Sequence, residues 1–255
     1  MGLNRSKIIK GLAVLAGTGA AAGAAYEIFC PKAEFFGRVI THGPRTTNAV
    51  GIVFDQGPNQ ATAAVCKRLH ELSIPAAFFI EGKKARSLPW AMDHIQAFEI
   101  GIHGEDYRPL IFKKEQDIRR SLRSTQFLVR EFQDKGARYF MPPYGFKDLR
   151  LMRVAHELGL IVVNPSLTLK IMPLRPYAAG MQARQDPAKS ISGAISRLLL
   201  KVRSGDIILI PSYLTAGQGG GRHDMAGLMP ELLTELVIGL KTIGLRPWGL
   251  KALIG

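Results

Sequence analysis

The chain has 255 residues, of which 47% are hydrophobic and 21% charged, a composition that supports a globular core and excludes a mainly disordered chain. Its two cysteines cannot build a disulfide framework, and because no CxxC or Cys/His cluster occurs, a zinc finger is excluded as well. The net charge of +14 favours anionic partners such as lipid headgroups, acidic glycans or nucleic acid, without selecting among them.

The N-terminal residues have the pattern of a membrane-targeting segment. Three basic residues and no acid lie among the first ten, and Gly11–Tyr26 then carries no charge. Extension to Phe29 approaches the ~20 residues that span a bilayer. We expect residues 1–30 to form a signal anchor or transmembrane segment that leaves residues 31–255 on the periplasmic or extracellular side. A cleaved signal and an ordinary buried helix are the alternatives. Removing residues 1–30 subtracts three bases and one acid, so the domain still carries +12.

Seven short apolar runs are predicted as strands, because they are rich in β-branched or aromatic residues and bounded by turn residues. They are Val50–Phe54, Ala76–Ile80, Glu99–His103, Arg138–Met141, Leu160–Asn164, Asp206–Ile210 and Leu245–Trp248. Helices are predicted over Gln60–Leu72, Glu115–Phe132, Leu149–Leu158, Ile191–Val202 and Met225–Ile243. This alternation predicts an α/β fold with a parallel sheet, and seven such units in about 225 residues are enough for a barrel. The irregular stretch Pro165–Gln185 is expected to be a loop over one rim.

Polar and turn-forming residues follow several of these strands, at the end where parallel barrels place their chemistry. They are Asp55-Gln56-Gly57-Pro58 after the first strand, His103-Gly104-Glu105-Asp106-Tyr107 at the third, Pro142-Pro143-Tyr144-Gly145 after the fourth and Pro211 after the sixth. The sequence therefore predicts a site at the carboxyl ends of the strands.

Taken in order, five segments resemble the polysaccharide deacetylases with a NodB-homology domain. They read VGIVFDQGPN, AAFFIEG, EIGIHGEDY, RYFMPPYG and SGDIILIP, and the resemblance runs from about Ala49 to the C-terminus. It implies a distorted (β/α)7 barrel over residues 31–255. It also implies an activity, the removal of N- or O-linked acetyl groups from a cell-envelope carbohydrate.

The resemblance implies a metal-assisted hydrolysis in which a carboxylate base, an Asp and two His metal ligands, and a His acid take part. Asp55 matches the base position and His103 the first His ligand. Gln56 and Tyr107 occupy the other two ligand positions, and Pro211 occupies the position of the acid. Since catalytic zinc normally takes three protein ligands and water, we expect no cofactor here.

A repaired site is the alternative, in which Glu105 and Asp106 act as surrogate oxygen ligands beside His103 and hold Zn or another divalent metal. The simpler interpretation is that these loop acids are solvated, that His103 is a hydrogen-bonded histidine of the barrel rim, and that Asp55 accepts hydrogen bonds from a tight turn. His223, in the Gly-rich loop Gly217–His223, is a remote candidate for the missing acid.

Carbohydrate binding is expected at the turn Pro143-Tyr144-Gly145, where the ring of Tyr144 offers a floor for a sugar, and at Trp248. Packing in the core is the simpler interpretation of both rings.

Two functions are therefore open. The first is a membrane-anchored carbohydrate deacetylase with an altered site. The second is a pseudoenzyme that binds a glycan or scaffolds a partner without turnover, which the loss of metal ligands favours. The expected partners are a carbohydrate or cell-envelope polymer and an anionic lipid surface. Nucleic acid is not expected, because charge alone supports it and no nucleic-acid-binding motif occurs.

Overall fold

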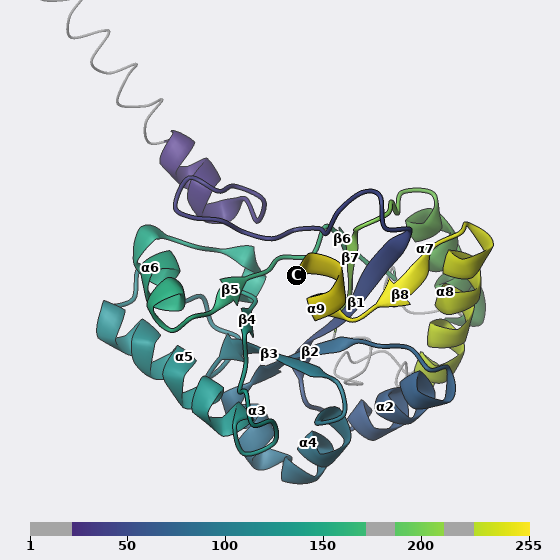
Figure 1. The fold of residues 1–255 in the computed structure, drawn as a ribbon, viewed down its shortest axis with the longest axis horizontal. Helices are drawn as coiled ribbons and strands as arrows, with labels where there is room; N and C mark the ends of the chain where they lie inside the picture. The colour runs from purple at the N-terminus through teal and green to yellow at the C-terminus, as the bar shows by residue number, and fades with distance from the viewer. Residues whose placement is uncertain (1–21, 172–186, 212–226) are drawn as a thin grey trace, which may run out of the picture.

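Short buried strands form a curled parallel sheet with helices around it (Figure 1). The computed structural model describes residues 22–171, 187–211 and 227–255, so the loop Gly217–His223 and most of the stretch Pro165–Gln185 lie outside the described residues. The strands are β1 (Ala49–Gly57), β2 (Ala77–Glu81), β3 (Glu99–Gly104), β4 (Tyr139–Phe140), β5 (Ile161–Val162), β6 (Leu167–Thr168), β7 (Ile207–Ile210) and β8 (Arg246–Trp248). The seven predicted strands are confirmed, and β6 lies in the stretch expected to be a loop.

The sheet has the order β5-β4-β3-β2-β1-β7-β6, and β8 pairs with the first residues of β1. All pairings between these strands are parallel. Between β5 and β7 the chain before β1 contributes two isolated bridges, Ile40 to Val163 and His42 to Asp206. The result is a distorted (β/α) barrel, as expected, with the ring completed on one side by an irregular segment.

Helices cover the outer face of the sheet. They are α2 (Thr62–Glu71), α3 (Gly82–Ser87), α4 (Pro89–Ile95), α5 (Glu115–Val129), α6 (Leu149–Glu157), α7 (Pro187–Leu199) and α8 (Met229–Thr242). The short helix α9 (Leu250–Ile254) lies at one end of the barrel, and a 3₁₀ turn η1 spans Pro143–Gly145. The five predicted helices are present, and α3, α4 and α9 are additional. Proline at the first position of α4 and the carboxylate of Asp148, which accepts a hydrogen bond from the Leu151 amide at 2.9 Å, fix two of the helix starts.

The apolar residues divide into two clusters by the alternation of the strands. Along β1, Val50, Ile52 and Phe54 belong to the cluster that also includes residues of the helices, whereas Ala49 and Val53 belong to a smaller interior cluster. Leu250 and Leu253 of α9 join that interior cluster, so α9 closes the barrel at the starts of the strands. The opposite end, where the strands finish, is left for the site.

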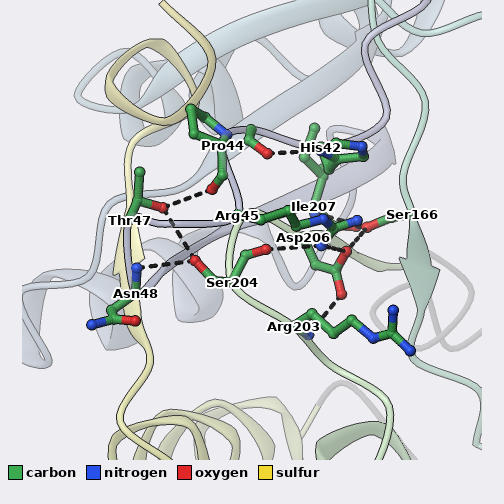
Figure 2. A network of polar contacts seen from close by, with 11 residues as sticks. His42, Pro44, Arg45, Thr47, Asn48, Ser166, Arg203, Ser204, Asp206 and Ile207 are labelled. Atoms are coloured by element: carbon green, nitrogen blue, oxygen red, sulfur yellow. Dashed lines mark hydrogen bonds and ion pairs between the residues drawn. The ribbon is translucent and has the colours of Figure 1, made fainter.

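A buried carboxylate ties the chain before β1 to the chain before β7 (Figure 2). Asp206 is 4% exposed and accepts hydrogen bonds from the Arg45 guanidinium at 2.7 Å, the Ser166 hydroxyl at 2.9 Å and the Arg203 amide at 2.8 Å. The Asp206 side chain therefore fastens segments that are 161 residues apart in the chain.

The N-terminal helix over residues 22–29, purple in Figure 1, is attached to the barrel next to α6. Lys147 is fully buried beneath it, where its ammonium donates to the Cys30 carbonyl at 2.6 Å and its amide donates to the Ile28 carbonyl at 3.1 Å. The Glu27 carboxylate accepts from the Phe36 amide at 3.2 Å. Among residues 22–171, 187–211 and 227–255, no helix is both long and apolar enough to cross a bilayer.

Candidate functional site

The alternation of three adjacent strands places Asp55, Glu81 and His103 on the interior face at the carboxyl ends of β1, β2 and β3. Each follows interior neighbours by steps of two residues: Ala49 and Val53 precede Asp55, Ala77 and Phe79 precede Glu81, and Gly101 precedes His103. All three polar residues are buried, with exposed fractions of 5% or less. Gly101 is required in this layer, because a Cβ at that position would lie 2.4 Å from the ring of Phe79.

Asp55 and Gln56 form the turn at the end of β1. Gln56 has a φ of 54°, a left-handed conformation that is unusual for a residue with a side chain. Its side-chain amide donates to the Asp55 carboxylate at 3.3 Å. At the position that the resemblance assigns to a metal-binding carboxylate there is therefore a neutral amide, which acts as a donor toward Asp55.

An ammonium group lies beside this turn. Lys84, in α3, donates from Nζ to the backbone carbonyl of Gln56 at 2.8 Å and forms an ion pair with Glu81 at 2.7 Å. The other oxygen of Glu81 accepts a hydrogen bond from the Tyr107 amide at 3.2 Å. Sequence reasoning missed both residues. The sequence does contain a pattern that could have indicated them: an acid at the end of an apolar strand, followed by Gly82 and two lysines.

His103 is fully buried, and its Nδ1 lies 2.6 Å from the Met141 carbonyl oxygen, so Nδ1–H is the donor and Nε2 carries a lone pair. Burial lowers the pKa of His103 to about 3, and the charge of Lys84 acts in the same direction. Nε2 has no hydrogen-bond partner within the described part of the chain. His103 is therefore a neutral acceptor at neutral pH.

The ring of Tyr107 packs against the imidazole of His103. Its ring meets that of His103 edge to face with centroids 5.0 Å apart, and its hydroxyl accepts a hydrogen bond from the Tyr144 amide at 3.3 Å. Burial, with the nearby Asp55 carboxylate adding, raises the pKa of Tyr107 to about 12. The phenol therefore stays protonated at neutral pH.

Tyr144 supplies an open aromatic face at the mouth of this group. It has a φ of 59°, its ring centroid is 4.7 Å from that of Tyr107, and its side chain is 52% exposed. Pro143 and Gly145 on either side are buried and shape the turn, and Gly145 has a φ of 73°. The structure thus brings Asp55, His103, Tyr107 and Tyr144 together.

Other predicted residues are not part of this group. Glu105 forms an ion pair with Arg86 and accepts from the Ser124 hydroxyl at 3.1 Å, and Asp106 is 2.9 Å from the Lys83 ammonium. Trp248 pairs with Gly51 in the first half of β1, towards the opposite end of the barrel.

Pro211 directly follows β7 and is buried. Having no side-chain proton, it cannot act as an acid.

These residues do not fit a divalent metal ion. Zinc favours imidazole, thiolate and carboxylate donors, whereas the other two ligand positions here hold an amide and a protonated phenol. The nearby carboxylates are already engaged, Asp55 by the Gln56 amide and Glu81 by the Lys84 ammonium. In the part of the chain that the structure describes, no three His, Cys, Asp or Glu residues are grouped so that they could hold a metal ion. What the group offers is a set of buried hydrogen-bonding side chains beside one exposed aromatic ring.

The fold is a parallel α/β barrel with polar residues at the carboxyl ends of its strands. Residues 42–163 match the family model for polysaccharide deacetylase. The resemblance seen in the sequence is thereby confirmed.

Among curated proteins, the chain is similar to a chitooligosaccharide deacetylase of Azorhizobium caulinodans, with 28% identity over 64% of this chain and 73% of the relative. Among solved structures it is similar to a peptidoglycan N-acetylglucosamine deacetylase, with 21% identity, a TM-score of 0.69 and coverage of 85% of this chain and 92% of the other. A carbohydrate esterase family 4 pseudoenzyme from Bacillus anthracis is similar too, with 16% identity, a TM-score of 0.66 and coverage of 86% and 69%. These structural likenesses support the fold.

Proposed function

We propose that this protein is a carbohydrate-binding member of the deacetylase family that recognises an acetylated cell-envelope glycan without metal-dependent turnover. The observation that carries this proposal is the replacement of a metal-ligand set by the group Gln56, Tyr107 and Lys84 around the neutral His103. The similar chitooligosaccharide deacetylase supports the substrate class. The similar pseudoenzyme supports a role in which this fold does not catalyse deacetylation.

The proposed binding uses the residues in their observed states. The exposed ring of Tyr144 stacks on the apolar face of the pyranose, as aromatic side chains in ligand pockets do. No step of this recognition requires a titrating group near neutral pH, because the pKa values of His103 and Tyr107 lie near 3 and 12.

Calorimetry with N-acetylated chitooligosaccharides tests this proposal, with acetate release followed in parallel. We expect binding that a chelator does not change, no acetate release, and about tenfold weaker binding in Tyr144→Ala. Phe127→Ala removes a similarly exposed ring on α5 and serves as the matched control. Chelator-sensitive release of acetate by the unmodified protein, abolished by Glu105→Ala or Asp106→Ala, would establish the active deacetylase with a repaired site instead.

We further propose that the N-terminal segment before the helix at residues 22–29 holds the domain at a membrane, with the barrel on the outer side. The supporting feature is the uncharged run Gly11–Tyr26 behind a basic N-terminus. Membrane fractions washed with carbonate should retain the full-length chain. Recovery of full-mass protein in the soluble cytoplasmic fraction would refute this topology.

A further inference from the structure

Six large apolar side chains are exposed around the start of α6 and the adjoining N-terminal helix. They are Tyr26, Phe29, Phe35, Phe112, Tyr144 and Leu149, and we call them the apolar rim. Phe35 is 88% exposed and Phe112 is 65% exposed. Exposure of so much apolar surface to water is unfavourable in free energy. The other exposed large apolar side chains of the described residues lie on or beside α4, α5, α7, α8 and β8.

Contacts between distant segments bring several of these side chains near one another. The ring of Phe29 meets that of Phe146 at 5.1 Å, and Phe146 stacks on Tyr144 at 5.6 Å. On the other side, the Phe112 amide donates to the Asp148 carboxylate at 3.1 Å, directly before Leu149. Phe35 is joined to the N-terminal helix through its neighbour Phe36, whose amide donates to Glu27. Four separate segments thus contribute to one surface.

Basic side chains accompany this surface. They are Lys32, Arg108, Lys113, Lys114 and Arg150, all at least partly exposed. The acids among them are Glu34, Asp106 and Asp148, and the last two carry ion pairs to Lys83 and Arg150. Exposed aromatic rings with a fringe of Lys and Arg are the composition of surfaces that lie in the headgroup region of anionic membranes.

The position of the chain beyond the described residues identifies the occupant. Residues 1–21, which contain the basic start and most of the uncharged run, precede the rim's own helix at residue 22. We propose that the apolar rim docks onto the surface of an anionic bilayer, so that the barrel is held in a fixed orientation rather than tethered loosely. This inference rests on the anchoring proposed above. It shares Tyr144 with the proposed sugar-binding face, whereas the other five rim residues take no part in the proposed sugar binding.

The test uses the full chain reconstituted in nanodiscs that contain anionic phosphatidylglycerol. A single environment-sensitive fluorophore is attached in a Cys30→Ser background either at Phe112→Cys or, as the matched control, at Ile238→Cys, an exposed apolar position on α8. Cys66 is buried, and burial raises the pKa of its thiol to about 12, so it stays unreactive. A quencher on the lipid headgroup should reduce emission at position 112 at least about twofold more than at position 238.

A second pair of variants distinguishes docking of the rim into the bilayer surface from a label that only lies near the bilayer. In a chain labelled at Leu149→Cys, the change Phe35→Ser with Phe112→Ser should restore water-like emission, whereas Phe127→Ser should not. Equal quenching at positions 112 and 238 would overturn the proposal, as would loss of the chain from the discs. If neutral-lipid discs leave position 112 exposed and soluble N-acetylated oligosaccharides protect it, the rim is a glycan surface and the proposal is refuted. Sugar binding measured by calorimetry reports on the sugar-binding face separately.

Discussion

Zinc affinity should rise when carboxylate and imidazole ligands are restored at positions 56 and 107, and the number of added ligands gives the size of the gain. Structural zinc sites with four ligands are stabilised by roughly 10–16 kcal/mol, or roughly 2.5–4 kcal/mol per ligand. Changing Gln56→Asp and Tyr107→His raises the number of strong donors at the three ligand positions from one, His103, to three. We therefore expect zinc affinity to rise by roughly 5–8 kcal/mol, which is roughly four to six powers of ten in Kd.

Lys84 opposes this gain, because its ammonium is 2.8 Å from the backbone oxygen of residue 56. Two unit charges 4 Å apart interact by ~4 kcal/mol at an effective dielectric of 20, and the partial exposure of Lys84 reduces this to roughly 1–2 kcal/mol. Removing the pair together, Glu81→Gln with Lys84→Gln, avoids leaving a buried carboxylate unpaired. Added to the double variant, it should change zinc affinity little, because the repulsion of the ammonium and the attraction of the carboxylate are removed together.

Calorimetry and metal analysis after dialysis measure these affinities, and Gln116→Asp, at an exposed glutamine of α5, controls for an added surface carboxylate. Acetate release should stay weak until Pro211→His supplies a proton donor, since general acid catalysis contributes about 10²–10⁴-fold. Stoichiometric zinc in the unmodified protein would refute the reasoning, and so would a refilled site with no gain in affinity despite an unchanged fold.

Three further outcomes follow from buried polar groups. Asp206→Ala should lower the free energy of unfolding by about 3 kcal/mol in urea, because three donors lose their acceptor; a change below about 0.5 kcal/mol would contradict this. The pKa of His103 is lowered to about 3, whereas an unfolded histidine titrates near 6.5, so the stability from its neutral form is lost as pH falls below that value. Between pH 7 and 5 the loss should be about 2 kcal/mol, absent in His103→Asn; equal pH dependence in both proteins would show that His103 is protonated in the fold. Lys147→Ala should free residues 22–36 and speed their proteolysis roughly 30-fold, equivalent to about 2 kcal/mol of local opening, whereas the exposed Lys32→Ala should not.

The strands and long helices were predictable because their signals are local. A buried strand such as β7 is four consecutive Ile and Leu residues, and α5 keeps Ile118, Leu122 and Thr125 on one buried face. The short helices α3 and α4 were missed because neither is long enough to show a period. β6 was missed because two residues carry no pattern, and its pairing with β7 fixes it instead.

The site was predictable in its strand-end residues but not in their electrostatics. Asp55, His103 and Tyr107 follow strands that the apolar runs reveal, and the parallel sheet then brings them together. The approach of Lys84 to the Gln56 carbonyl depends on α3, which was not predicted. The ion pairs that hold Glu105 and Asp106 likewise come from α3, through Arg86 and Lys83. Contacts of this kind depend on where a neighbouring helix lies.

The position of β1 has a consequence for the order in which the molecule assembles. β1 lies in the interior of the sheet, yet β7 and β8, two of its three partners, come from the chain after residue 206. Until that part is synthesised, one of the most apolar strands has incomplete pairing, and such exposed strand edges promote association with other chains. A deletion at the C-terminus is therefore a deletion in the middle of the sheet. The residues after 206 complete its interior.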